Sequence, residues 1–109
     1  MFIKISTDFT DTPGGRDIKE GPFSGEQFRK EILSPKYAEA LKKGEKLTVD
    51  FDGCFGYATS FLEESFGGLV RERQEKGILN HINLISNDDL SVYRLVNDYV
   101  QKAESKLHV

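Results

Sequence analysis

The chain has 109 residues, of which 38% are hydrophobic and 30% charged, and its formal net charge at pH 7 is −3. This length and composition predict one folded domain and exclude a disordered segment. The acidic balance gives no support for binding to nucleic acids or to anionic membranes, which both require a basic face.

Targeting signals and cysteine usage narrow the class further. The first residues, MFIKISTDF, lack the apolar stretch of a signal peptide, and no apolar run approaches the roughly 20 residues of a membrane span. Cys54 is the only cysteine, so an internal disulfide and a cysteine-based metal site are excluded. We therefore expect a cytoplasmic protein, because reducing compartments keep thiols free.

The N-terminal residues predict a β-hairpin. Residues 2–5 form an apolar strand, and Thr12-Pro13-Gly14-Gly15 is a turn sequence. Residues 16–20 can return as the second strand, although Ile18 is their only large apolar side chain.

Two helices are predicted between residues 24 and 44. Ser24 is the expected N-cap of the first, with Gln27 completing a capping box and Phe23 and Phe28 forming a hydrophobic staple. Ser34-Pro35 then predicts a new cap followed by proline at the first position of a second helix, which ends at Gly44.

The middle of the chain predicts a strand that leads into a helix. Apolar and polar residues alternate from 47 to 52, as in a half-buried strand, and from Ser60 the apolar spacing becomes helical. The expected buried stripe is Phe61, Leu62, Ser65, Phe66, Leu69 and Val70. Because glycine destabilises a helix interior by roughly 1 kcal/mol relative to alanine, Gly67-Gly68 indicates close packing at that point.

The last third predicts one more strand and one more helix. Ile82, Leu84 and Ile85 mark the strand, and Ser86 or Asn87 is the expected cap of the final helix. The stripe of that helix is Val92, Leu95, Val96, Tyr99 and Ala103, and the tail after residue 103 is expected to fray.

Strands that alternate with helices predict an α/β sandwich. The expected architecture is a mixed four-stranded sheet with about four helices, in a single domain over residues 1–109.

The unit formed by the strand at 47–52 and the following helix resembles the signature of STAS domains, the fold of bacterial anti-sigma factor antagonists. In that signature an apolar strand with Asp is followed by Asp-Ser-Ser-Gly at a helix start. Alignment of Val49-Asp50-Phe51 with the strand places Thr59-Ser60 on the Ser-Ser pair. Ala58 replaces the Asp of the signature, and Phe61 replaces its Gly.

The chain is still more similar to a small STAS-like family of unassigned function, often found beside histidine-kinase-type ATPases. The similarity lies in TPGGR at 12–16, EGPFSGEQFR at 20–29, GYATSFLEESFGGLVRE at 56–72 and ISNDD at 85–89. This resemblance implies a signalling module whose partner is such an ATPase. It also implies phosphorylation of the second hydroxyl residue, Ser60.

Ser60 has two interpretations. In the structural one, Ser60 and Glu63 form a capping box worth about 1 kcal/mol to the helix. In the functional one, Ser60 is phosphorylated and the added charge alters partner binding. Glu63 and Glu64 lie close by and oppose added negative charge, and Thr59 is an alternative cap or acceptor.

The loop Gly53-Cys54-Phe55-Gly56-Tyr57 is a second candidate site. Its aromatic rings can form a docking surface or a ligand pocket, or Phe55 and Tyr57 can fold inward as part of the core. Cys54 is a poor candidate nucleophile, because neither His81 nor His108 is placed beside it by the sequence.

Metal binding and cofactor binding are not predicted. Asp50 and Asp52 share one face of the strand, but a single pair of carboxylates without histidine is a weak metal site, and solvent-facing charges explain it better.

The favoured function is a non-enzymatic module that binds a protein partner through loop 53–57 and the helix start, with Cys54, Phe55, Gly56, Tyr57, Thr59, Ser60, Glu63 and Glu64 as the contact residues. The alternative is a small-ligand or nucleotide sensor that holds an anionic group at the same loop and helix N-terminus. Homodimerisation through a sheet edge or through Gly67-Gly68 is left open.

Overall fold

The computed structural model describes residues 1–108. Its sheet contains three strands in the order β1-β2-β3, namely β1 (Phe2–Lys4), β2 (Leu47–Asp50) and β3 (Ile82–Ile85). All neighbours are parallel, with Ile3 opposite Val49 and Val49 opposite Leu84. Leu47 and Val49 are buried and the polar residues between them face outward, so the alternation in the sequence predicted this strand correctly.

The expected fourth strand is absent from residues 1–108, and the sheet is parallel rather than mixed. Residues 16–20 instead contain the 3-10 helix η1 (Ile18–Glu20). Ile18 is 52% exposed, so a strand at this position would bury no apolar face. The backbone of residues 14–16 bonds to the start of the next helix, as in the pair Gly25 N to Gly15 O at 2.8 Å.

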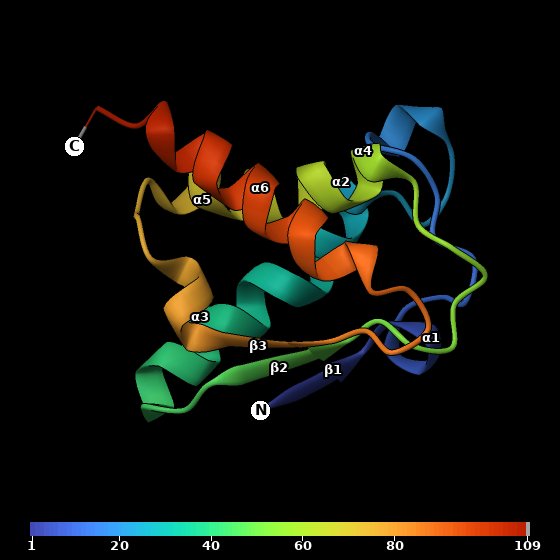
Figure 1. Cartoon of the computed structure of the whole chain (residues 1–109), viewed down its shortest axis with the longest axis horizontal. Helices are drawn as coiled ribbons and strands as arrows, with labels where there is room; N and C mark the ends of the chain where they lie inside the picture. Colours follow the sequence, from blue (N-terminus) through green and yellow to red (C-terminus); the bar gives the residue numbers. More distant parts are fainter. Residues whose placement is uncertain (109) are drawn as a thin grey trace.

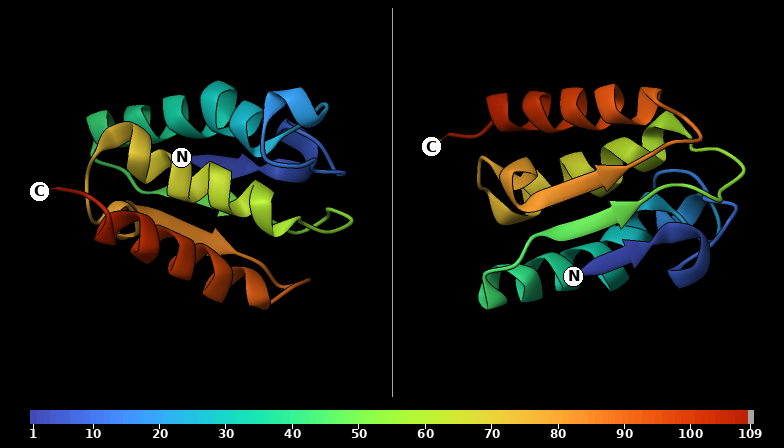
Figure 2. Two further views of the ribbon diagram at one scale, coloured as in Figure 1. Left: turned by 90° about the horizontal axis from the view of Figure 1, so that it is seen from above. Right: turned by 60° about the horizontal axis from the view of Figure 1, so that its bottom comes forward.

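Three long helices cover one face of the sheet, and the other face is bare. Figure 1 shows the second and third of them above the strands, while the first descends at its green end to the level of the strands; the right-hand view of Figure 2 shows the strands in front of the first two helices. Two right-handed crossovers in the same direction place their helices on the same side, which accounts for this two-layer arrangement. The short α1 (Ile5–Asp8) follows β1 at the carboxyl edge of the sheet.

The first long helix runs without a break through α2 (Gly25–Phe28), the π turn η2 (Arg29–Leu33) and α3 (Ser34–Lys43). Ser24 is its N-cap as predicted, since its Oγ accepts a hydrogen bond from Gln27 N at 3.0 Å. Gln27 Oε1 in turn accepts from Phe23 N at 2.9 Å. The ring of Phe9 packs against both residues of the predicted staple, at centroid distances of 5.3 Å from Phe23 and 5.4 Å from Phe28.

Ser34 does not cap a second helix, which corrects the prediction. Its φ of −63° and ψ of −48° are helical, and its N–H bonds to Arg29 O across the wide π turn. This turn immediately precedes Pro35, whose nitrogen cannot donate a hydrogen bond, and the helix continues past the proline. It ends at Gly44 in the left-handed conformation, as expected.

The second long helix comprises α4 (Thr59–Leu62), the π turn η3 (Glu63–Gly67) and α5 (Gly68–Arg73). Every residue of the predicted stripe is buried, with at most 1% of its surface exposed. The close packing at Gly67-Gly68 is also confirmed, because a Cβ on Gly68 would lie 2.6 Å from Arg29 Nε. Both glycines are buried, so they offer no free face for a dimer.

The last helix, α6 (Ser91–Ser105), follows β3 and begins later than predicted. Neither Ser86 nor Asn87 caps it. Asp89 Oδ1 accepts hydrogen bonds from Ser91 N and Ser91 Oγ instead, at 3.0 and 2.6 Å. Ser86 is buried, and its Oγ bonds to Asp89 O within the loop. The helix extends to Ser105, and its buried stripe includes Val100 in addition to Val92, Val96 and Ala103.

The core fills the space between the sheet and the helices and includes Phe28, Phe51, Phe61 and Phe66. Among the helices of residues 1–108, none combines the length and the apolar composition that a membrane crossing requires.

Candidate functional site

The candidate site lies at the carboxyl edge of the sheet, where the loops after the three parallel strands meet. In Figure 1 the loop between β2 and α4 extends furthest at this end of the molecule. The loop that follows β3, residues 86–90, lies beside it, because Gly53 N donates to Asp88 Oδ2 at 2.9 Å. Ligand and partner sites of open parallel sheets usually occur outside the carboxyl ends of the strands.

The helix begins at Thr59, close to the predicted position. Its N-cap is Ala58, with extended φ and ψ of −66° and 140°, and no side chain caps it. The predicted cap at Ser60 or Thr59 is therefore wrong, and so is the capping box with Glu63. Thr59 is exposed and Ser60 partly buried, so both hydroxyls lie at the first turn next to solvent.

Loop 53–57 divides its aromatic side chains between the core and the solvent. Tyr57 turns inward, where its hydroxyl donates to Phe51 O at 2.7 Å and lies 3.0 Å from Cys54 Sγ. Its ring packs against Phe51 and Phe61 at centroid distances of 5.4 and 5.9 Å. Phe55 turns outward and is 85% exposed. Inward folding, one of the alternatives left open by the sequence, is therefore confirmed for Tyr57 and wrong for Phe55.

The loop conformation requires glycine. Gly53 has φ of +92° and Gly56 has φ of +138°, a region that side chains disfavour. A Cβ on Gly53 would also lie 2.9 Å from Ser6 Oγ. The backbone of Phe55 is fixed by a 2.9 Å hydrogen bond from its nitrogen to Asp11 O. The exposed ring is therefore carried by an ordered loop.

Asp52 joins the loops after β2 and β3. Its Oδ1 accepts from Asn87 N at 2.7 Å and from Asp88 N at 2.9 Å, and its Oδ2 accepts from Asn87 Nδ2 at 3.0 Å. These hydrogen bonds, that from Asp88 N most of all, hold the pKa of Asp52 below its ordinary value. The carboxylate of Asp50 has other partners, because its Oδ2 pairs with Lys4 at 3.2 Å and its Oδ1 accepts a hydrogen bond from Asp52 N at 2.9 Å.

The geometry gives little support for metal binding or for a reactive thiol at Cys54. Within the described part of the chain, residues 1–108, no three His, Cys, Asp or Glu side chains are grouped so as to hold a metal ion. Burial raises the pKa of the Cys54 thiol, and its Sγ lies 3.5 Å from Thr10 O. His81 packs against Tyr37 of α3, and His108 follows the end of α6.

Glu63 and Glu64, two of the predicted contact residues, are held by arginines of the same chain. Arg71 binds Glu63 Oε2 at 2.7 Å, and Arg16 binds the other oxygen of Glu63. Arg29 binds Glu64 Oε2 at 2.9 Å. Partial burial alone would raise the pKa of Glu63, but the hydrogen bonds from Arg71 and Arg16 outweigh it and lower that pKa. These side chains stabilise the fold beside the site.

Leu90 is a surface residue that the sequence did not single out. It is 71% exposed, and it lies in the loop of residues 86–90, which is hydrogen-bonded to Asp52 beside loop 53–57. The sequence could have indicated this exposure, because Leu90 lies outside the apolar stripe of α6. Below Phe55, a cavity of about 260 Å³ is lined by residues of both loops, among them Cys54, Tyr57, Ser86, Asp88 and Asp89.

Part of the chain matches a family of known proteins. Residues 24–91 match the model of a family described as STAS-like domain of unknown function (DUF4325). The match covers well over half of the chain, including loop 53–57, the start of α4 and both strands β2 and β3. No curated protein and no solved structure matches the chain.

Proposed function

Because the chain belongs to the STAS-like domain family of unknown function, we propose that it is a non-enzymatic regulatory module that binds a protein partner. The family resemblance suggests a histidine-kinase-type ATPase as that partner. We define the docking surface as loop 53–57, Thr59, Ser60 and Leu90. The proposal places the protein in the cytoplasm, in keeping with its single free thiol at Cys54.

The exposure of Phe55 is the observation that carries this proposal. Burial of a large aromatic side chain contributes roughly 2 kcal/mol, and Phe55, which is 85% exposed on an ordered loop, does not gain this stabilisation in the isolated chain. Leu90, 71% exposed, adds a second apolar side chain on the adjoining loop. Clustered apolar side chains mark interaction sites, and aromatic residues often dominate the energy of an interface.

The hydroxyls at the start of α4 supply a means of control. A phosphate on Ser60 or Thr59 would add about −1.5 to −2 charges within an otherwise apolar contact, and its desolvation would weaken the complex. Repulsion from Glu63 and Glu64 is reduced, because both carboxylates are paired with arginines. This arrangement removes the main electrostatic objection to phosphorylation at this position.

The geometry favours a protein partner over an anionic ligand. Asp88 and Asp89 are among the residues that line the cavity beneath Phe55, and their negative charges repel a phosphate or carboxylate group. A nucleotide or a similar ligand would meet this repulsion, whereas a protein surface that covers Phe55 and Leu90 would not need to enter the cavity.

The test is calorimetric titration of the protein with a purified histidine-kinase-type ATPase from the same genome, the partner class that the family resemblance suggests. Phe55→Ala should weaken binding at least about tenfold, as expected for an interface hot spot. Phe2→Ala is the matched control, since Phe2 is also exposed, by 52%, but lies on the bare face of the sheet. Unchanged affinity of Phe55→Ala, or an equal loss with Phe2→Ala, would contradict the proposed surface.

Phosphorylation needs a separate experiment. Incubation with the same ATPase and ATP, followed by mass spectrometry, should find phosphate on Ser60 or Thr59, and Ser60→Asp should weaken the complex. Phosphate at other residues only, together with normal binding by Ser60→Asp, would refute control at the helix start while leaving the docking surface to the calorimetric test.

A further inference from the structure

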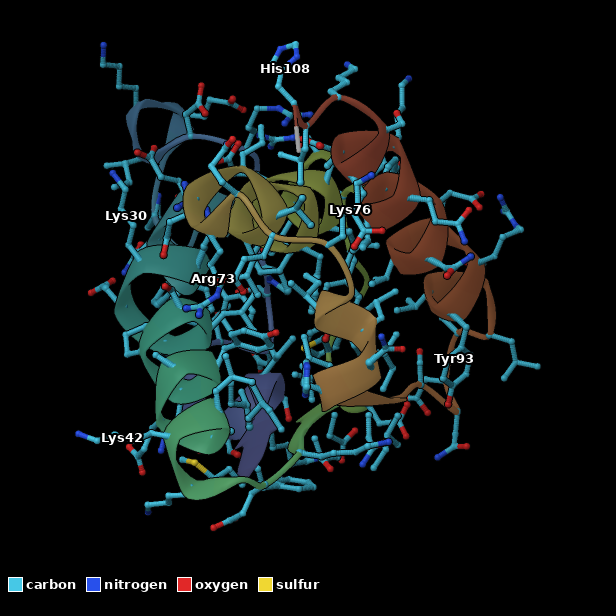
Figure 3. The ribbon with its side chains drawn as sticks, turned by 90° about the vertical axis from the view of Figure 1, so that its left-hand side faces the viewer. Lys30, Lys42, Arg73, Lys76, Tyr93 and His108 are labelled. Carbon is cyan, nitrogen blue, oxygen red and sulfur yellow. The ribbon has the colours of Figure 1, made fainter. Side chains whose placement is uncertain are left out.

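A second cavity lies far from the docking surface and has a different chemistry. It measures about 540 Å³ and is a groove between the carboxyl-terminal ends of α5 and α6. Figure 3 views this end of the molecule, with His108 labelled beyond the end of α6. In Figure 1 the chain ends on this side, and the loop after β2 lies on the opposite side.

The floor of this groove is apolar and belongs to α6 and the residues after it. Tyr99 and Ala103 are four residues apart on α6 and so share one face of the helix, and Leu107 follows just beyond the end of the helix. Ala103 is only 5% exposed, and the other two side chains are partly buried against the core. The groove therefore offers a continuous apolar strip.

The rim of the groove is cationic. Lys102 and Lys106, again four residues apart, flank the apolar strip, and Arg71 approaches from α5. Within residues 1–108, neither Lys102 nor Lys106 forms an ion pair.

Glu63, the carboxylate of the lining, does not cancel this positive charge. It binds Arg71 at 2.7 and 3.1 Å and is also bound by Arg16. Both arginines lie within 4 Å of Glu64 as well, but Glu64 is bound at 2.9 Å by a third arginine, Arg29, so two carboxylates are shared by three guanidinium groups. Arg71 is 46% exposed and lines the groove, with both of its terminal nitrogens bonded to Glu63. Two lysines and this arginine thus leave a net positive rim on a chain whose formal net charge is −3.

We propose that the groove between α5 and α6 binds a small amphipathic anion. The apolar body of the ligand lies along Tyr99, Ala103 and Leu107, and its carboxylate, sulfonate or phosphate group binds Lys102, Lys106 and Arg71. Small-molecule sites are typically concave and mostly apolar, with a few charged groups that fix the orientation of the ligand. The volume of this groove falls in the ordinary range of such sites, roughly 300–1,000 Å³.

The experiment uses 8-anilinonaphthalene-1-sulfonate, which combines an aromatic body with one negative charge and fluoresces when it is bound. The wild-type chain should give a saturable signal with one site, and the affinity should fall as ionic strength rises. N-phenyl-1-naphthylamine has nearly the same body without the sulfonate, and it should bind at least about tenfold more weakly. Equal binding of the two probes would overturn the role of the cationic rim.

A pair of charge-reversal variants locates the site. Lys102→Glu with Lys106→Glu should weaken binding of the sulfonate probe at least about tenfold. Lys42→Glu with Lys43→Glu, on α3, makes the same change in net charge outside the groove and should leave the affinity within about twofold. Circular dichroism at the same temperature checks that both variants are folded.

Amide chemical shifts supply the second readout and keep the proposal falsifiable if a variant unfolds. Addition of the sulfonate probe to the wild-type chain should shift the amides of residues 99–107. The proposal would be overturned by the absence of saturable binding, by shifts confined to loop 53–57, or by equal weakening in the two charge-reversal variants.

Discussion

Replacement of Gly68 with alanine tests how tightly the two long helices enclose Arg29. Gly68 has helical φ and ψ of −60° and −37°, so alanine fits the backbone and gains about 1 kcal/mol of helix propensity. Its Cβ, however, would lie 2.6 Å from Arg29 Nε and 3.0 Å from Arg29 Cδ, which forces the arginine to move.

The cost of that movement exceeds the gain in helix propensity. The Arg29 side chain is only 12% exposed and binds Glu64 Oε2 at 2.9 Å and Glu72 Oε1 at 2.6 Å. Breaking a buried ion pair costs about 3 kcal/mol or more. We therefore expect Gly68→Ala to lower the free energy of unfolding by about 2 kcal/mol, the difference between these two effects.

Urea unfolding of four chains measures this difference: the wild type, Gly68→Ala, Arg29→Ala and the double variant. When Arg29 has been removed, the same Gly68→Ala change should stabilise the chain by about 1 kcal/mol. The expected reversal of sign is the decisive result. The explanation of the close contact would be refuted if Gly68→Ala stabilised the wild-type chain, or if it had the same effect in both backgrounds.

Three further measurements follow from the hydrogen bonds and pKa values. Ser24→Ala should cost about 1 kcal/mol of unfolding free energy because it removes a helix cap, whereas Ser60→Ala should change it by less than about 0.5 kcal/mol; equal costs in urea unfolding would contradict the assignment of caps. Folding lowers the pKa of Asp52 from the ordinary 3.8, so its contribution to stability is complete above that pH and is lost as the pH falls through the folded pKa. Asp52→Asn should accordingly destabilise the chain at pH 7, and its difference from the wild type should shrink below about pH 4; a constant difference would refute this. Cys54 should react with iodoacetamide at pH 8 more slowly than free cysteine, since burial raises its pKa, and an equal or faster rate would contradict that environment.

The sequence predicted the elements whose apolar pattern is strong. The alternation at residues 47–50 and the stripe from Phe61 to Val70 both correspond to buried faces. Ser24 was identified as a cap because its partner lies only three residues away, at Gln27. These features depend on local spacing, which a sequence displays directly.

The errors arose where a distant residue decides the outcome. Ser60 and Glu63 have the spacing of a capping box, but Arg16 and Arg71 compete for the glutamate. The strand expected at residues 16–20 has too little apolar surface to join the sheet. Instead of pairing with a strand, the backbone of this region forms hydrogen bonds with the start of α2. Likewise, the site was predicted only in part, because the outward turn of Phe55 and the exposure of Leu90 depend on how the loops pack against each other.

The single covered face of the sheet has a consequence for mutational tolerance. Along β2, Leu47 and Val49 face the core, while Thr48 faces water in a row with Phe2 and Asn83. If β2 is randomised, the requirement to fold should therefore restrict the choice of residue at every second position only. The permissive row also provides attachment points for a fluorophore or an affinity tag, on the face of the sheet that the helices leave uncovered (Figure 2).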